Sequence, residues 1–283
     1  METAVVMAVA MATLGISGGL ETSAHAKAIQ NDVIVYPGSD PTTWENAYEY
    51  HHLIEELGLT IASKTLSPSN TLGINGFDMG LEANTSLIHG QSSYWQKAAK
   101  DGSIPRLFAY PTLRVRKGLP FSLEGGMTIS YLPFTQQQVL GGQGRFALHE
   151  GYALVPNVAV QLSYDKYIGN QQLDMEVKQA VATMGYTWPF GETRDLKTGR
   201  ISGWLGYGKG NINSNVNTRV IAPGDKTAFL TSLGTDGDGH LLIAYDKWVA
   251  GVEIESGHFA FLVNGEFVDG GIPTINARWG AQF

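Results

Sequence analysis

Charged and amide side chains alternate with apolar ones in several stretches of the chain. This set comprises Arg106, Arg114, Arg116, Glu124, Gln161, Asp165, Asp174, Glu176, Lys178 and Arg278. Successive side chains of a strand point to opposite faces of a sheet, so we expect the whole set on one enclosed face. Opposed charges there either neutralise each other in a rigid ion-pair network or line a polar pathway that selects solutes. The ion-pair network is the favoured interpretation.

Few groupings suggest catalysis or metal binding. His149-Glu150 lies far from the rim where such sites are expected, and the stretch from Asp236 to His240 lacks the spacing and final Glu of an EF-hand. His51 and His52 are adjacent on a predicted helix, so they point about 100° apart. No helix follows the glycine-rich run 206–210, as a phosphate loop requires. We therefore expect no enzyme, no metal site and no cofactor.

The composition excludes several classes of protein. The chain has 283 residues, an apolar content of 43% and a formal net charge of −7, with a mean hydropathy of −0.07. It is too polar for a bundle of membrane helices, and its acidity argues against a nucleic-acid partner. Without cysteine, it forms no disulfide or thiolate metal site.

The N-terminal region resembles an export signal. An apolar stretch from Ala4 to about Leu20 precedes Ala24-His25-Ala26, the small-x-small pattern that signal peptidase reads. We expect residues 1–26 to be a signal peptide, cleaved before Lys27, although Met1-Glu2-Thr3 supplies no basic residue. The alternative is an N-terminal membrane anchor.

Residues 27–69 are expected to form a periplasmic segment with one helix at 43–57. Thr42 and Glu45 have the spacing of a capping box, and Gly58 supplies a stop signal. Such a helix would cover the periplasmic mouth of the fold or enter its interior, and a periplasmic linker is the alternative.

From residue 70 onward the apolar period is two. We predict about ten antiparallel strands in residues 70–283, the first at 72–83, with eight or twelve as alternatives. A turn at 117–120 would place Arg114 opposite Glu124, and a break in the alternation at Asp246-Lys247 suggests a β-bulge. The connections alternate between short and long, which is typical of outer-membrane barrels whose short turns face the periplasm.

The last strand supports a transmembrane β-barrel. Its apolar residues, at every second position, are Ile275, Ala277, Trp279, Ala281 and Phe283. This strand resembles the closing strand of Gram-negative outer-membrane β-barrel proteins. The resemblance implies an all-β antiparallel barrel in the outer membrane, with lipid and the barrel-insertion machinery as partners.

Aromatic residues near strand ends are candidates for the interfacial girdles of such a barrel. They are Tyr131, Phe134, Tyr164, Tyr167, Trp188, Phe190, Trp248 and Trp279. A soluble all-β sandwich or barrel, with its apolar face turned toward a protein core, is the competing fold.

Three short runs carry a second resemblance. They are 72–77 (LGINGF), 117–121 (KGLPF) and 148–151 (LHEG). These runs resemble a group of proteobacterial outer-membrane proteins that is distantly similar to the long-chain fatty-acid outer-membrane transporters. Those transporters have a larger barrel with an N-terminal plug, a role that residues 27–69 could supply in part.

These observations predict a passive pore or transporter for small or amphipathic solutes. The alternative is a closed structural or surface-interaction barrel that acts through its long loops at 86–105 and 209–238.

Overall fold

The computed structural model describes residues 33, 35, 47–99, 104–133, 137–150, 155–193, 196–217, 226–236 and 238–283. The predicted signal peptide, the capping box at Thr42 and Glu45, and Phe134 lie outside the described residues.

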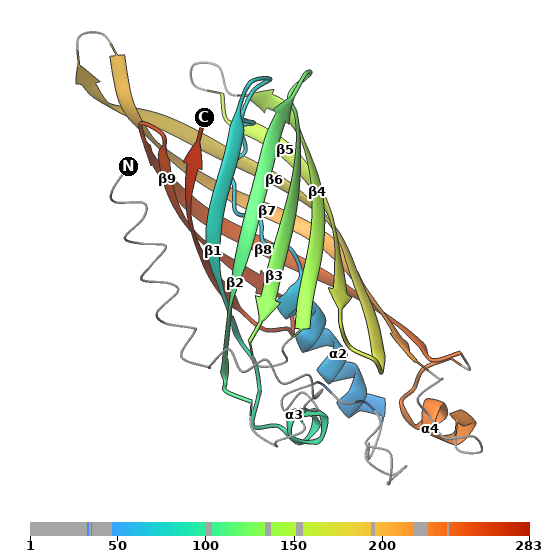
Figure 1. Cartoon of the computed structure of the whole chain (residues 1–283). Helices are drawn as coiled ribbons and strands as arrows, with labels where there is room; N and C mark the ends of the chain where they lie inside the picture. Colours follow the sequence, from blue (N-terminus) through green and yellow to red (C-terminus); the bar gives the residue numbers. More distant parts are fainter. Residues whose placement is uncertain are drawn as a thin grey trace, which may run out of the picture.

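Ten antiparallel strands in the described part of the chain close into one barrel (Figure 1). They are β1 Phe77–Leu87, β2 Leu107–Leu119, β3 Leu123–Leu132, β4 Gln137–Glu150, β5 Asn157–Ile168, β6 Leu173–Thr193, β7 Leu196–Val216, β8 His240–Ser256, β9 Phe259–Val268 and β10 Thr274–Gln282. Each strand pairs with its neighbours in sequence, and β1 closes the barrel by pairing with β10. The Phe77 amide donates to the Phe283 carbonyl at 2.9 Å, so the closing strand is paired to its last residue. The predicted ten-stranded barrel is confirmed.

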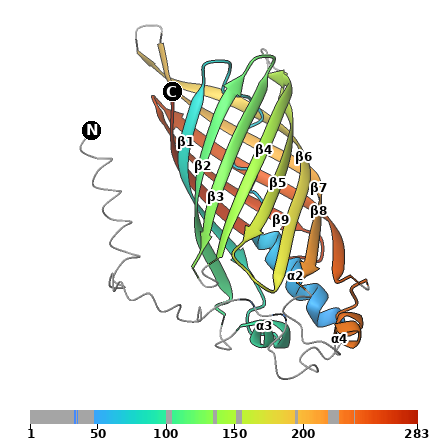
Figure 2. The same cartoon turned by 45° about the vertical axis from the view of Figure 1, so that its right-hand side comes forward.

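The barrel has two unlike ends. At the short-turn end lie the chain terminus and the connections 120–122, 151–156, 194–195 and 257–258. At the loop-rich end lie the connections 88–106, 133–136, 169–172, 217–239 and 269–273. Helices α3 (Ser93–Ala98) and α4 (Lys226–Ser232) belong to the longest two of these connections and sit beyond the strands (Figure 2).

Helix α2 (Ala47–Ile61) also lies at the loop-rich end, opposite the terminus of β10 (Figures 1 and 2). It was predicted to cover the mouth that holds the short turns or to enter the interior. It does enter the interior, but from the loop-rich end, which corrects the first of these two placements. The predicted end at residue 57 is also wrong, because Gly58 continues the helix. A Cβ at Gly58 would lie 2.6 Å from Ile212, so this glycine permits close approach to β7 and does not stop the helix.

Strand boundaries near the first hairpins differ from the prediction. β1 begins at Phe77, five residues later than expected, and β2 continues to Leu119. The turn between β2 and β3 contains Phe121 and Ser122, which have φ values of 63° and 54°. With the turn shifted, Gly118 and not Arg114 is opposite Glu124. The predicted Arg114–Glu124 register is therefore wrong.

The predicted bulge at Asp246-Lys247 is also wrong. β8 pairs without a register shift on both sides, and Lys247 points into the barrel between the inward Tyr245 and Val249. In the described strands the irregularity falls in β4, between Ala147 and His149.

The outer wall is apolar between two aromatic bands. Near the loop-rich end the exposed aromatics include Tyr131, Tyr164, Tyr207, Trp248 and Phe267; near the short-turn end they include Phe146, Trp188, Phe190, Phe259 and Trp279. Phe259 and Phe267 lie eight residues apart on β9, or roughly 27 Å of strand, enough for a tilted strand to cross an apolar layer. Tyr167, predicted for a girdle, is instead buried inside the barrel. None of the described helices is long and apolar enough to span a membrane.

Candidate functional site

The lumen is occupied by the protein's own chain. Residues 62–76, the plug segment, connect the end of α2 at the loop-rich mouth to the start of β1 at the short-turn mouth (Figure 1). Side chains from Ala62 to Ser69 are buried. The segment has no regular secondary structure, so its backbone polar groups need partners from the barrel wall.

The first part of the plug segment bonds to inward residues of four strands. The Ser63 amide donates to Asp165 of β5 at 2.8 Å, and its hydroxyl donates to the other oxygen of that carboxylate at 2.5 Å. Two residues on, the Thr65 amide donates to Glu266 of β9 at 2.7 Å. Gln179 donates to the Ser63 carbonyl, and the Arg114 guanidinium donates to the Lys64 carbonyl at 3.0 Å. The plug is thus bonded around the barrel circumference.

Arg145 of β4 holds the second part. Its guanidinium donates to the Asn70 carbonyl at 2.9 Å, to the Pro68 carbonyl at 2.5 Å, and also to the Ser67 hydroxyl. The side chain is 5% exposed, so these oxygens replace water as the hydrogen-bond partners of its guanidinium. This buried guanidinium restrains the segment at three residues: Ser67, Pro68 and Asn70.

Around the plug, inward charges pair across neighbouring strands. Arg114 pairs with Glu82, while Arg116 and Arg278 share Asp78. Arg116 also contacts Glu124 at 3.1 Å, and Lys247 contacts Glu266 at 3.1 Å. All of these side chains are at most 4% exposed. Charges buried to this degree are stable when paired, and the pairs tie adjacent strands together.

Little free space remains around the first part of the plug. The cavity that touches Ser63, Lys64, Arg114 and Asp165 has a volume of about 10 Å³. That is room for about one water molecule, so it provides no continuous path for a solute. A wider cavity of about 260 Å³ lies at the short-turn end, between Asn70 and wall residues that include Asn157 and Arg200. The described residues therefore close the lumen at the level of Ser63 and Lys64.

Toward the loop-rich end the lumen is apolar. Helix α2 inserts Leu53, Ile54 and Leu57, each fully buried, into a cluster with inward side chains of the strands. The strand residues of this cluster include Tyr167, Leu173, Met175, Val177, Ile212, Val216, Ile243 and Tyr245. The helix therefore closes the wide mouth as the core of a soluble domain would.

Two carboxylates of α2 bind α3 and its preceding loop. Glu56 accepts hydrogen bonds from Tyr94 at 2.9 Å and Trp95 at 2.6 Å, and from the ring of His89. Glu49 accepts from Lys97 at 2.8 Å. Partial burial, and then the nearby Glu56 carboxylate, raise the pKa of Tyr94 above its usual range, so the phenol remains a donor. We call α2, α3 and α4 the helical cap.

The structure places six of the ten predicted lumen residues inside: Arg114, Arg116, Glu124, Gln161, Asp165 and Arg278. The other four are corrections. Arg106 precedes β2 and is exposed. Asp174, Glu176 and Lys178 point outward, where Lys166 pairs with Asp174 at 3.5 Å and Lys178 with Glu176 at 3.2 Å. Their inward neighbours on β6 are apolar because this part of the wall surrounds α2.

Several site residues were missed from the sequence. They are Ser63, Lys64, Asp78, Glu82, Arg145, Lys247, Glu253 and Glu266. Asp78, Glu82, Lys247 and Glu266 alternate with apolar neighbours, so the period of two could have identified them. The plug residues carry no such signal, because a segment without regular structure has no period.

The side chains of Ile275 and Trp279 on β10 and of Phe283, which follows it, are exposed, and Ala277 and Ala281 are half-buried. The role of this strand as an insertion signal stays a prediction. Among the described residues, no group of three or more His, Asp or Glu side chains is placed to hold a metal ion.

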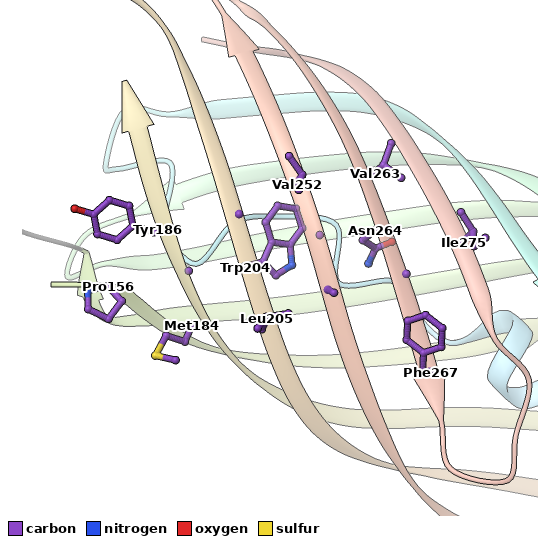
Figure 3. Close-up of a pocket in the computed structure, with 15 residues that line it drawn as sticks. Pro156, Met184, Tyr186, Trp204, Leu205, Val252, Val263, Asn264, Phe267 and Ile275 are labelled. Carbon is purple, nitrogen blue, oxygen red and sulfur yellow. The ribbon is translucent and has the colours of Figure 1, made fainter. Parts of the chain in front are cut away.

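The outer wall also has a groove of about 850 Å³ over β6–β10. Met184, Leu205, Val252 and Phe267 are outward side chains that line it, as Figure 3 shows. On its inner side the ring of Trp204 lies against Gly251, where a Cβ would come within 2.2 Å of the indole. The groove belongs to the apolar wall and not to the polar lumen.

Comparisons with known proteins return low similarities. No protein-family model matches the chain, and no curated protein matches it. The N-terminal β-barrel domain of Pseudomonas aeruginosa OprF is 12% identical, with a TM-score of 0.30, over 75% of this chain and 99% of that one. Ail, the attachment invasion locus protein of Yersinia pestis, is 10% identical, with a TM-score of 0.31, over 74% and 99%. Outer membrane protein Omp33 of Acinetobacter baumannii is 9% identical, with a TM-score of 0.30, over 75% and 99%.

Values this low transfer no function to this chain. The pairing of the strands in this chain establishes the fold. The polarity of the outer wall shows which surroundings the barrel has. A closed barrel leaves no strand edge unpaired, and this one has an apolar outside and buried charges inside, as lipid requires. The chain is an outer-membrane β-barrel protein.

Proposed function

We propose that this protein is a closed outer-membrane barrel that presents its helical cap for interaction at the cell surface. The observation that carries the proposal is the plug segment, which fills the lumen and bonds to the wall through Asp165, Glu266 and Arg145. A lumen filled in this way favours a scaffold over a conduit.

The orientation is part of the proposal. Outer-membrane barrels have short periplasmic turns and longer extracellular loops. By this rule the short-turn end faces the periplasm, and the loop-rich end, with α2, α3 and α4, faces outward. The alternating closing strand supports recognition by the barrel-insertion machinery from the periplasm.

Passive transport remains a second candidate, favoured by the charges of both signs in the lumen. It requires the plug segment to leave or rearrange, because the cavity at Ser63 and Lys64 is about 10 Å³. The distant similarity to long-chain fatty-acid transporters likewise stays a prediction. An N-terminal stretch inside the barrel is in keeping with it, whereas ten strands make a narrower barrel than theirs.

Conductance in planar bilayers separates the two candidates. We expect the intact protein to give no stable single-channel steps. A variant that lacks residues 47–70 serves as the matched control, because it removes α2 and most of the plug but leaves all ten strands. We expect that variant to conduct. Stable steps from the intact protein would contradict the closed barrel and support transport.

A further inference from the structure

We infer that the barrel carries its own N-terminal region to the outside of the cell, so that the chain upstream of α2 is displayed at the surface. The inference rests on the orientation in the proposed function. It goes further, because it assigns the barrel the role of an anchor and exit path for whatever precedes α2.

The direction of the plug is the first evidence. The chain enters β1 at the short-turn end, where the Phe77 amide bonds to the Phe283 carbonyl. Going backward along the sequence, the plug segment passes Arg145 and then Asp165 and reaches Ile61, the last residue of α2, at the loop-rich end. The polypeptide therefore crosses the lumen once, from the loop-rich mouth to the short-turn mouth.

Two residues upstream of α2 give independent evidence. Val33 forms an isolated β-bridge with Ala99, which follows α3, and its carbonyl accepts from Asn170 at 2.8 Å. The Val35 amide donates to the Gln172 side-chain oxygen at 2.8 Å. Ala99, Asn170 and Gln172 all belong to loop-rich connections. The chain is thus already docked at this end before α2 begins.

The described residues leave no room for a second crossing. Such a crossing through the lumen would need the space that the plug, α2 and the ion pairs occupy, and the cavity at Ser63 and Lys64 is about 10 Å³. A crossing outside the barrel in an irregular conformation would expose unpaired backbone groups to lipid, at a cost of several kcal/mol for each group. Cleavage before Lys27 leaves six residues ahead of Val33, too few for the roughly 20 that a spanning helix needs. We therefore expect the region before Val33 to stay on the side where α2 lies.

The chain contains no cysteine, so single cysteines can report which side each part occupies. We choose Tyr48→Cys on α2, where the side chain is 69% exposed, and Gln91→Cys in the exposed loop after β1. Phe121→Cys, in the turn between β2 and β3, is the matched site at the short-turn end, 87% exposed. Intact cells are treated with a membrane-impermeant maleimide, and heat-modifiable gel mobility shows that each variant is folded.

We expect Tyr48→Cys and Gln91→Cys to be labelled equally on intact cells, and Phe121→Cys only after the outer membrane is permeabilised. If Gln91→Cys is labelled and Tyr48→Cys is protected, the threading is wrong while the orientation holds. If Phe121→Cys is labelled and Gln91→Cys is protected, the orientation is wrong and both proposals fail.

A peptide epitope placed between Ala26 and Lys27 tests display itself. We expect antibody binding to intact cells to equal binding to lysed cells. Binding seen only after lysis would overturn the inference.

Discussion

The wall of this barrel has opposite polarity in two parts: the part between the aromatic bands and the part beyond them, at the loop-rich end. Between the aromatic bands its outside is apolar and its inside holds buried ion pairs such as Arg114–Glu82. Beyond Tyr164 and Trp248, toward the loop-rich end, its outside carries exposed ion pairs such as Lys166–Asp174, and its inside is an apolar core around α2. The same strands run through both parts, for example β6, β7 and β8, which pair without a register shift.

The difference teaches that alternation alone does not identify the lipid-facing side. In β6, Met175 and Val177 point inward, and farther along the same face the polar Gln179 and Thr183 flank the apolar Val181. One face thus changes from apolar to polar where the surroundings change from a helix to a polar plug. The outer face changes in the reverse sense, from water to lipid.

The largest expected effect comes from breaking a buried pair in the polar part. Arg114→Met leaves the Glu82 carboxylate buried without the cation that contacts it, and also removes the bond to the Lys64 carbonyl. We expect the free energy of unfolding in detergent to fall by about 3–5 kcal/mol. Adding Glu82→Leu should restore much of this loss; a single variant as stable as the parent would show that the pair holds nothing together.

The apolar part is tested by Leu57→Ala. Leu57 is fully buried between α2 and the strands, so truncation removes packing and leaves a cavity. A loss of about 2–5 kcal/mol is expected, measured by denaturant unfolding. Tyr48→Ala on the exposed side of the same helix is the control, with an effect within about 0.5 kcal/mol. Equal effects of the two variants would mean that α2 does not pack into the barrel.

Gly58→Ala sharpens the contact between α2 and β7. Alanine favours a helix by about 1 kcal/mol over glycine, but here its Cβ would meet Ile212 at 2.6 Å. We expect a net destabilisation of about 1–3 kcal/mol from overpacking. Combining it with Ile212→Ala should make the Gly58→Ala step less costly, and a stabilising Gly58→Ala would exclude this close approach.

The smallest effect is expected outside. Lys166→Met removes an exposed partner of Asp174, 3.5 Å away on the outer face beyond the aromatic bands. Exposed pairs contribute about 0–1 kcal/mol, so the melting temperature should barely change. A loss as large as that of Arg114→Met would show that this outer face is not in water.

Much of the barrel could be predicted from the sequence, because strands with one face in lipid alternate in a regular way. Ten strands, the closing β10 and the inward Arg114, Arg116 and Arg278 follow from that period. The period also misled: Asp174, Glu176 and Lys178 were placed in the lumen because apolar neighbours were assumed to face lipid. In this part of β6 the inward face is set by the position of α2, which belongs to the tertiary structure.

The plug could not be predicted in the same way. Ser63 to Asn70 lack the period of helix and strand, and their partners Asp165 and Glu266 lie 102 and 201 residues away from Ser63 and Thr65. Gly58 was predicted to end the helix because glycine is common at helix ends. Glycine is also common where two elements pack closely, and the sequence does not distinguish the two cases.

The central claim is that residues 62–76 occupy the lumen, and a double-cysteine variant tests it most directly. Ser63→Cys with Asp165→Cys joins the plug to β5, where the two side chains now lie 2.5 Å apart. Thr112→Cys with Ser130→Cys is the control across β2 and β3, an inward pair 2.7 Å apart. Both bonds would form during export into the oxidising periplasm and are scored by non-reducing gel mobility. The account predicts that both pairs form disulfides, and a bond in the control but not between residues 63 and 165 would contradict it.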